Sequence, residues 1–473
     1  MNPAPESLPS VAKPTARSPI DFETDLGPLP LRGELPDGLV GALVRNGPNP
    51  VFPNPAEHWF VGDGMLHAFY LADGQVHYRN RWIRTQRYLA ERAAGKPLQN
   101  SLGQGGAKDD GVANTNVVAH ASRLLALEEA HLPMEIDLAT LGTRGPTDLQ
   151  GGLSGPFTAH PKTDPQTGQM LFFGYGTPAP LSAGMRFGVI DADGRVERLE
   201  QFEAPYASMV HDFAISARHV IFPVSPLTGS MERARTGRPP FAWEPEYGTR
   251  VGLLPRGGRI EDMVWWRGPA CYVFHVMNAF EADGCVHVDV MQFAAPPLFP
   301  RIDGTPAAND KEAARLVRWT FDLAAAEGNP SPEFSQRLLD PTPGEFPRID
   351  ERYTGRPYRH GWIASHVGEG TEMHLYCALT HIDLATATRE SWFFDPQDRV
   401  SEAVFVPRSA DAPEGEGWLL AVAWRAAEDR SDLVVFDAQH VARGPVCVAE
   451  LPHRVPGGFH GGWFPAGFPG ATR

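Results

Sequence analysis

The chain has 473 residues, with 42 basic and 57 acidic side chains, a formal net charge of −15 and no basic run. Because nucleic-acid binding needs a positively charged surface, this balance argues against a nucleic-acid partner. The content of 42% hydrophobic and 21% charged residues is typical of a globular protein with a large core.

The N-terminal segment 1–19 is rich in Pro, Ser and Ala and lacks the apolar stretch of a secretory signal. We expect it to be a disordered tail, followed by a single catalytic domain over residues 20–473. No apolar run approaches the roughly 18 residues of a transmembrane helix. The four cysteines form no CxxC pair, which predicts reduced thiols and a cytoplasmic location.

Turn signals recur along the chain between stretches that alternate apolar and polar residues. Such Asp-Gly or Gly turns lie within 71–80, 164–175, 191–202 and 281–293. Asp-Gly favours the type I′ turn of a β-hairpin. Helical periodicity is scarce: we expect a short helix over 87–94, and a strand followed by a turn within 312–327. With 48 glycines and 46 prolines, the chain is predicted to be all-β, either a propeller with degenerate blades or a large sandwich.

Four histidines lie in short contexts typical of strand ends. They are His160, His211, His275 and His460. Imidazole nitrogen binds Zn, Cu, Fe or Ni, so four neutral imidazoles could hold one divalent metal at the centre of a closed fold. The four lie far apart along the chain, and their spacing matches no local metal motif. Because the chain contains 17 histidines, spacing alone favours ordinary core or surface positions for these four.

Six further motifs add to the contexts of these histidines. They are RNGPNP (45–50), HWFVGDGMLHAF (58–69), NTN (114–116), EFPRID (345–350), SEAVFVPR (401–408) and EDRSDLVVFDA (428–438). In number, order and spacing they resemble the carotenoid cleavage oxygenases, a family that includes apocarotenoid-, stilbene- and phenylpropenoid-cleaving enzymes. The resemblance extends from about residue 30 to the C-terminus.

The resemblance implies a seven-bladed β-propeller with a dome of loops and helices over the metal-bearing face. The two shorter gaps, from His160 to His211 and from His211 to His275, would then be close to one blade each. It also implies that the four histidines hold one Fe(II) per subunit, with coordination positions left for O2. The stretch 62–64 matches a family turn, in which we expect the two glycines to supply positive φ angles.

The same resemblance implies three glutamates that orient the histidine ligands by accepting their second ring N–H. The matching positions are Glu129, Glu345 and Glu402, and Glu128 is the alternative to Glu129. Thr115 matches a threonine whose methyl group lies beside a vacant iron position. It is therefore expected to limit how solvent or O2 binds.

The implied reaction is oxidative cleavage of a conjugated C=C bond of a small hydrophobic alkene, with O2 as co-substrate and two carbonyl products. No organic cofactor is expected. A carotenoid or apocarotenoid is favoured as substrate. The alternative is a stilbene or phenylpropenoid such as 4-hydroxystilbene, isoeugenol or 4-vinylguaiacol, which would give vanillin-like aldehydes. Two other classes stay open: a non-catalytic ligand-binding propeller and a retinoid isomerohydrolase on the same fold.

The residues expected to contact a phenolic substrate differ from those of the phenol-cleaving members. Those members carry a lysine directly before the first orienting glutamate and a tyrosine on the preceding loop. Here Glu128 takes the lysine position, and no tyrosine lies between Tyr88 and Thr115. Glu128 is therefore the candidate phenol contact. The apolar stretches 178–187 and 293–300 are candidates for peripheral membrane contact.

Overall fold

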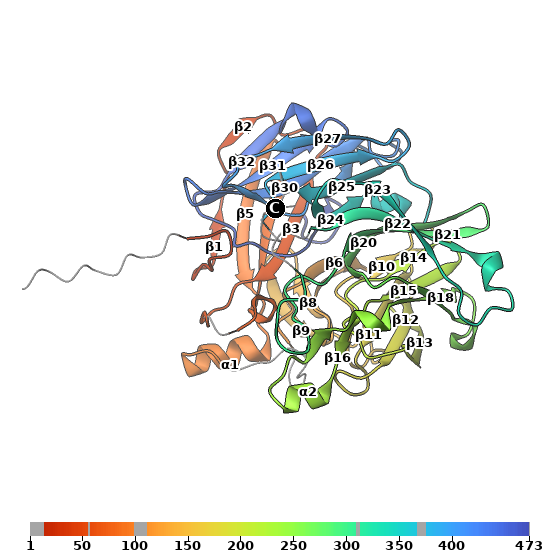
Figure 1. Cartoon of the computed structure of the whole chain (residues 1–473). Coiled ribbons are helices and arrows are strands. Elements are labelled where there is room, and N and C mark those ends of the chain that lie inside the picture. The colour runs from red at the N-terminus through yellow and green to blue at the C-terminus, as the bar shows by residue number, and fades with distance from the viewer. Residues whose placement is uncertain (1–13, 55–56, 99–110, 309–312, 367–374, 473) are drawn as a thin grey trace, which may run out of the picture.

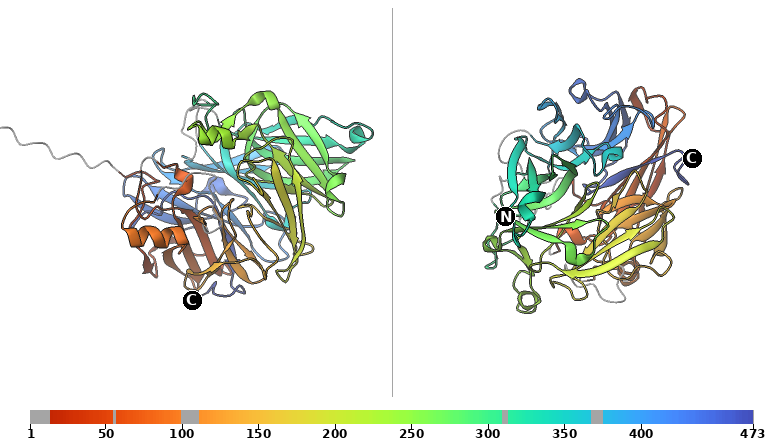
Figure 2. Two further views of the ribbon diagram at one scale, coloured as in Figure 1. Left: turned by 90° about the horizontal axis from the view of Figure 1, so that it is seen from below. Right: turned by 90° about the vertical axis from the view of Figure 1, so that its right-hand side faces the viewer.

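The computed structural model of the chain describes residues 14–54, 57–98, 111–308, 313–366 and 375–472. Within these residues, seven antiparallel sheets form a ring; we call them blades 1 to 7. In the right-hand view of Figure 2 the chain colours follow one another around the ring, and blue meets red where it closes. This arrangement confirms the predicted seven-bladed β-propeller.

The first four blades follow one another along the chain. Blade 1 contains β1 (Thr24–Leu26), β3 (Gly41–Pro48), β4 (Gly64–Ala72), β5 (Gln75–Trp82) and β33 (Gly461–Pro465). Blade 2 contains β6 (Asn116–His120), β7 (Arg123–Leu127), β8 (Met134–Asp137) and β9 (Gly142–Pro146). Blade 3 contains β10 (Lys162–Thr163), β11 (Met170–Tyr175), β12 (Gly184–Ile190) and β13 (Val196–Glu203). Blade 4 contains β14 (Ala214–Ile215), β15 (His219–Val224), β18 (Thr249–Pro255) and β19 (Val264–Gly268).

Three further blades complete the ring. Blade 5 contains β20 (Tyr272–Ala282), β21 (Cys285–Phe293), β22 (Arg315–Asp322) and β23 (Ser335–Asp340). Blade 6 contains β24 (Gly344–Ile349), β25 (His360–Ser365), β26 (Ala378–Asp383) and β27 (Thr388–Phe393). Blade 7 contains β2 (Leu31–Gly33), β28 (Arg399–Val400), β29 (Val404–Pro407), β30 (Gly417–Arg425), β31 (Arg430–Asp437) and β32 (Cys447–Glu450).

Both ends of the domain close the ring. Near the C-terminus, β33 pairs with β3, with Trp463 opposite Leu43. Near the N-terminus, β2 pairs with β32 of the last blade, with Leu31 opposite Ala449. Figure 1 shows the result, with red and orange strands beside blue ones. The closure therefore involves two blades, blade 1 through β33 and blade 7 through β2, and it leaves fewer unpaired strand edges.

The apolar core lies between neighbouring blades, with one large cluster of buried side chains at each of the seven contacts. Middle strands such as β4 and β30 are buried on both faces. The outer strand β13 alternates intermediate and exposed residues and carries four glutamates and glutamines of its VERLEQFE sequence on or near the surface. Charged outer edges of this kind discourage pairing with another chain.

The predicted hairpins and the predicted helix are present. Asp73 and Gly74, between β4 and β5, have φ angles of 51° and 68°, as a type I′ turn requires. The helix is α1 (Gln86–Ala94), with the Thr85 hydroxyl accepting from its first turn. The segment expected to be a strand and turn is β22 followed by the 3₁₀ helix η4 (Leu323–Ala326).

The expected role of the glycines at 62–64 is wrong. Gly62 has an extended backbone with φ of −68°, and Gly64 has no positive φ. A steric requirement explains the glycine at position 64 instead, because a Cβ there would lie 2.6 Å from the Val112 carbonyl oxygen.

Most of the predicted tail, residues 1–13, lies outside the described residues. For residues 14–19 the structure differs from the prediction. Ala16 is buried and its carbonyl accepts from Gly457 N–H, and the Ser18 carbonyl accepts from Arg454. Among the described residues, no helix is long and apolar enough to cross a membrane.

Several short elements lie in the connections between the strands of the blades. They are the hairpin of β16 (Leu227–Gly229) and β17 (Phe241–Trp243), the helix α2 (Met231–Arg235), and the 3₁₀ helices η1 (Trp59–Val61), η2 (Pro245–Tyr247), η3 (Ile260–Asp262), η5 (Glu351–Tyr353) and η6 (Val441–Arg443). In Figure 1, α1, α2 and β16 lie along the lower edge. Leu227 and Trp243 of the hairpin share an apolar cluster with Tyr272 of β20, so this part of the dome packs on blade 5.

Candidate metal centre

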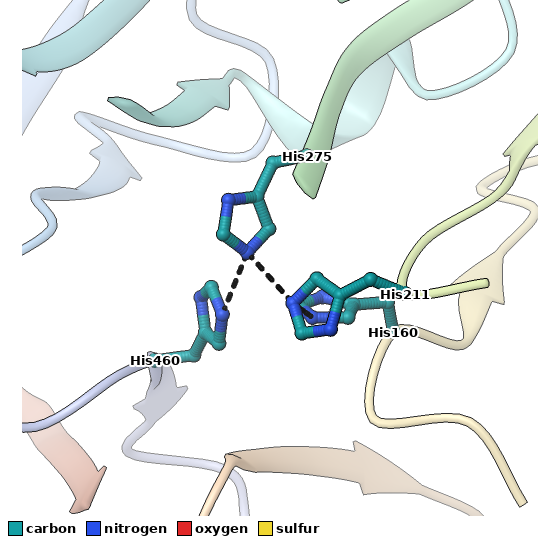
Figure 3. A group of neighbouring side chains, drawn as sticks. All are labelled: His160, His211, His275 and His460. Carbon is teal, nitrogen blue, oxygen red and sulfur yellow. Dashed lines mark hydrogen bonds between the residues drawn. The ribbon is translucent and has the colours of Figure 1, made fainter. Parts of the chain in front are cut away.

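The four predicted histidines come together at the centre of the ring (Figure 3). His160 lies just before β10, His211 just before β14, His275 within β20 and His460 just before β33. These are edge strands of blades 3, 4, 5 and 1. The gaps of 51 and 64 residues therefore each correspond to one step around the ring, and the gap of 185 residues spans three steps.

The four Nε2 atoms point toward one another. Successive Nε2–Nε2 distances are 3.1 Å for His160–His211, 3.2 Å for His211–His275 and 3.1 Å for His275–His460. A metal–imidazole bond is about 2.1 Å long, and two such bonds at right angles place their nitrogens about 3.0 Å apart. All four donor atoms lie within 4.8 Å of one another, so the cluster fits a single non-haem metal ion.

Three carboxylates accept from the outward-facing Nδ1 of three of these rings. Glu129 accepts from His211, Glu345 from His275 at 2.5 Å, and Glu402 from His460 at 2.9 Å. Such contacts fix the ring orientation and place the lone pair on Nε2, where a metal would bind. The glutamates belong to blades 2, 6 and 7, which provide no histidine to the cluster. Each blade thus contributes one imidazole or one carboxylate.

Burial keeps most of these imidazoles neutral. It lowers the pKa of His275 to about 3 and that of His460 to about 4, and it lowers the pKa of His160 well below its usual value, together with the nearby imidazoles. At His211 burial acts in the same direction, but the carboxylate of Glu129 outweighs it and the pKa is raised. Neutral imidazole is the form that binds a metal, so the donors suit the proposed role.

The three carboxylates have different surroundings. Glu402 lies between two guanidinium groups, with Arg45 Nη1 3.3 Å from Oε2 and Arg348 Nη1 3.5 Å from Oε1. Burial alone would raise its pKa, but Arg348, His460 and Arg45 hold that pKa well below its usual range. Glu345 contacts His275 and, among the described residues, no arginine or lysine, and burial raises its pKa to about 8. Arg45 and Arg348 were missed by sequence reasoning, although both lie in quoted motifs.

Glu129, and not its neighbour, is the residue that contacts a histidine of the cluster. Its second oxygen accepts from the hydroxyl of Tyr175 at 2.5 Å. Glu128 instead accepts from Val112 N–H at 2.9 Å and contacts the ring of His131. Its carboxylate therefore holds the segment before β6, and these contacts do not support the expected role of Glu128 as a phenol contact.

The carboxylate of Asp212 contacts the neighbours of three ligands. Its carboxylate accepts from Val276 N–H at 2.8 Å and from Phe213 N–H at 2.7 Å. It also pairs with Lys162 Nζ at 2.8 Å. These partners lie within two residues of His275, His211 and His160. Asp212 therefore connects the three chain segments that carry these histidines.

Thr115 lies next to the cluster through the backbone. Its carbonyl accepts from His460 N–H at 3.1 Å, and its hydroxyl donates to Asn114 at 3.0 Å. The structure thus brings Thr115 and all seven predicted histidines and glutamates into one region. Their roles as ligands and supports remain predictions.

The two stretches expected to contact a membrane combine exposed and buried residues. In the first, residues 178–180 are exposed, whereas Met185 and Phe187 are buried. In the second, Leu298 is 43% exposed and Phe299 is buried. Membrane contact stays a prediction.

Comparisons with known proteins agree over nearly the whole chain. A sequence model for the retinal pigment epithelial membrane protein matches residues 17–465. Isoeugenol monooxygenase from Pseudomonas putida is 37% identical, over 94% of this chain and 96% of its own length. Lignostilbene-α,β-dioxygenase isozyme III from Sphingomonas paucimobilis is 36% identical, over 94% and 95%. Carotenoid cleavage oxygenase from Mycobacterium tuberculosis is 32% identical, over 95% and 96%.

A solved structure shows the same architecture. Lignostilbene dioxygenase from Pseudomonas brassicacearum superposes with a TM-score of 0.91 at 36% identity, and the match covers 97% of this chain and 100% of that one.

Proposed function

Because the chain belongs to the family of the retinal pigment epithelial membrane protein and the carotenoid cleavage oxygenases, we propose that it uses Fe(II) and O2 to cleave a conjugated C=C bond. The products are two carbonyl compounds, and no organic cofactor takes part. The observation that carries this proposal is the convergence of four Nε2 atoms within 4.8 Å on the propeller axis.

The chain's own groups hold the metal and its surroundings. His160, His211, His275 and His460 would bind one Fe(II), which supplies the redox chemistry that lets O2 react with an alkene. Because all four ligands are neutral imidazoles, they leave the dipositive charge of the metal uncompensated. The ring orientation of three ligands is held by Glu129, Glu345 and Glu402.

Apolar side chains next to the ligands favour a hydrophobic substrate. Phe274 lies edge-on to the ring of His211, with centroids 5.4 Å apart, and Phe346 stacks on His275 at 5.3 Å. Such rings exclude water from the alkene and favour its flat conjugated system. We also propose that Thr115, whose carbonyl accepts from His460 N–H, restricts what reaches the metal.

Within this chemistry, the relatives favour a small phenolic alkene. The relatives named for isoeugenol and lignostilbene are 37% and 36% identical, whereas the carotenoid oxygenase is 32% identical. We therefore propose a stilbene or phenylpropenoid as substrate. An apocarotenoid is the second candidate, because the contexts of His275 and His460 resemble the carotenoid-cleaving members.

We place the enzyme in the cytoplasm, as a single catalytic domain. The four cysteines are free thiols, three of them buried, which suits a reducing compartment. A non-catalytic propeller would not need the complete set of four imidazoles and three carboxylates. An isomerohydrolase would need a retinyl ester as substrate and would consume no O2.

A product assay on iron-reconstituted protein in air tests the proposal. A para-hydroxystilbene, a propenyl phenol and a long apocarotenal are supplied side by side, and aldehyde formation and O2 uptake are measured. Aldehyde from the phenolic alkenes supports the substrate proposed here, and aldehyde from the polyene alone reverses that choice within the same chemistry. An absence of aldehyde and of O2 uptake with every substrate would contradict the proposed function.

A further inference from the structure

Tyr272 carries a hydroxyl that nothing in the described part of the chain satisfies. The residue begins β20, three positions before His275, and its side chain is fully buried at 0% exposure. Its Oη has no hydrogen-bond partner among the described residues. Other tyrosines of the chain contrast with it, because buried Tyr70 donates to the Leu138 carbonyl at 2.6 Å.

An unpaired buried hydroxyl is costly to keep. Leaving such a group without a partner costs about 1–3 kcal/mol, and the isosteric phenylalanine would avoid this cost. Buried polar groups in proteins are nearly always paired with protein groups or with ordered water. Because no described residue pairs with it, the Tyr272 hydroxyl is available to hydrogen-bond a bound molecule.

The ring of Tyr272 is linked to the metal centre through one intervening aromatic ring. Its ring packs edge-on against Phe274 at a centroid distance of 4.8 Å, and Phe274 in turn packs against His211. Burial, and then the charges of Glu129 and Glu345, raise the pKa of Tyr272 well above its usual value. The hydroxyl therefore keeps its proton and lies near the two carboxylates that orient His211 and His275.

Apolar side chains also pack around Tyr272. It belongs to a buried cluster that includes Phe274, Phe293 and Phe299, together with Leu227 and Trp243 of the dome. A conjugated aromatic ring fits such surroundings, and a single hydrogen-bonding group within them would select for one polar substituent on that ring. Glu128 does not supply this group, because Val112 and His131 already engage its carboxylate.

We propose that the Tyr272 hydroxyl is the specificity group that hydrogen-bonds the phenolic oxygen of the substrate. This inference rests on the proposed function, and it gives the chain a phenol contact at a position different from the expected lysine and tyrosine. Tyr272 selects the substrate and does not take part in bond cleavage. A site built to hydrogen-bond a hydroxyl discriminates strongly against an analogue that lacks it.

The test compares Tyr272→Phe with the wild type on two substrates, 4-hydroxystilbene and unsubstituted stilbene. In the wild type, kcat/KM for 4-hydroxystilbene exceeds that for stilbene. In the variant this preference falls about 10- to 100-fold, because only the phenolic substrate loses a hydrogen bond. The iron content and the melting temperature stay at or above the wild-type values, since the variant removes an unpaired buried group.

Tyr70→Phe is the matched control. It removes a paired hydroxyl in the first blades, so it lowers the melting temperature and leaves the preference between the two substrates unchanged. An unchanged preference in Tyr272→Phe, or an equal loss on both substrates, would overturn the inference while leaving the proposed function intact. If the wild type cleaves no alkene at all, it is the proposed function that fails.

Discussion

Two sides of the metal centre pair a buried histidine with a buried glutamate in opposite electrostatic surroundings. On one side, Glu402 accepts from His460 and also contacts the guanidinium groups of Arg45 and Arg348. On the other, Glu345 accepts from His275 without an arginine, and the further charge that affects its pKa, apart from the histidines, is that of Asp212. The first side is cationic around its carboxylate, and the second is not.

The comparison shows that the same histidine–glutamate contact can contribute to protein stability in one place and mainly to ligand orientation in another. The carboxylate of Glu402 neutralises buried Arg45 and half-buried Arg348 as well as orienting His460, so it contributes to the stability of the protein. The carboxylate of Glu345 has no cation to neutralise, because burial keeps His275 neutral, so its main contribution is to the ligand. A glutamate whose carboxylate oxygens are not shared with arginines is also the stronger hydrogen-bond acceptor for the ring N–H of its histidine.

Removing a metal ligand that belongs to neither side gives the largest effect. In His211→Ala the cluster loses one of its four Nε2 donors, so iron content and alkene cleavage fall to background. Metal analysis of the purified protein and an aldehyde assay measure the two losses. His287→Ala, in which the lost ring contacts Thr320 on blade 5, is the control and keeps both properties. Normal iron content in His211→Ala would contradict the assignment of the site.

Neutralising one glutamate at a time separates the two sides. In metal-free protein, Glu402→Gln leaves buried Arg45 without its counterion and removes one of the two carboxylates that pair with Arg348, so it lowers the free energy of unfolding by about 3–5 kcal/mol. Glu345→Gln changes it by less than about 1 kcal/mol, because no buried cation is left unpaired. Urea unfolding of the two variants and the wild type measures the difference.

Activity should respond to both substitutions. Each variant loses the carboxylate that orients one ligand, so each lowers iron affinity or turnover by about 10- to 100-fold. Equal destabilisation by the two substitutions would show that the arginines do not distinguish the two sides. Full activity in Glu402→Gln would show that this glutamate does not support a ligand.

The sequence predicted the histidines and glutamates of this site, but it did not predict the arginines that contact them. Strand-end contexts and family motifs pointed to His275 and Glu345, and repeated Asp-Gly turns pointed to hairpins. Arg45 could not be linked to Glu402, because 357 residues separate them and only the closure of the ring brings blades 1 and 7 together. A long-range ion pair of this kind leaves no pattern in local sequence.

Predictions from local sequence patterns were wrong at two places where contacts with distant parts of the chain determine the backbone conformation. Gly64 was expected to supply a positive φ, but it is required by the approach of the Val112 carbonyl, which belongs to another segment. Residues 14–19 were expected to belong to a disordered tail, yet their backbone carbonyls accept hydrogen bonds from residues 454 and 457 near the C-terminus. Both errors come from contacts between distant parts of the chain.

Asp212 offers a way to weaken the side that lacks arginines. In Asp212→Asn the amide cannot accept from both Val276 and Phe213 and loses the charge that pairs with Lys162. We expect iron affinity to fall about 10-fold, with a smaller change in KM for the alkene. Iron titration and steady-state kinetics separate these effects. Asp191→Asn, in a turn of blade 3, is the control, and a change confined to melting temperature would assign Asp212 a structural role only.

The smallest effect is expected at the third carboxylate, which is supported by a neutral donor. Tyr175 donates to Glu129, so Tyr175→Phe removes one hydrogen bond and leaves every charge in place. Its effect on iron affinity should be about threefold, well below that of Glu402→Gln, because one hydrogen bond contributes about 1 kcal/mol. Iron titrations of the two variants under the same conditions compare them. A loss as large as that of Glu402→Gln would mean that the hydroxyl, and not the cationic surroundings, determines how well a glutamate holds its histidine.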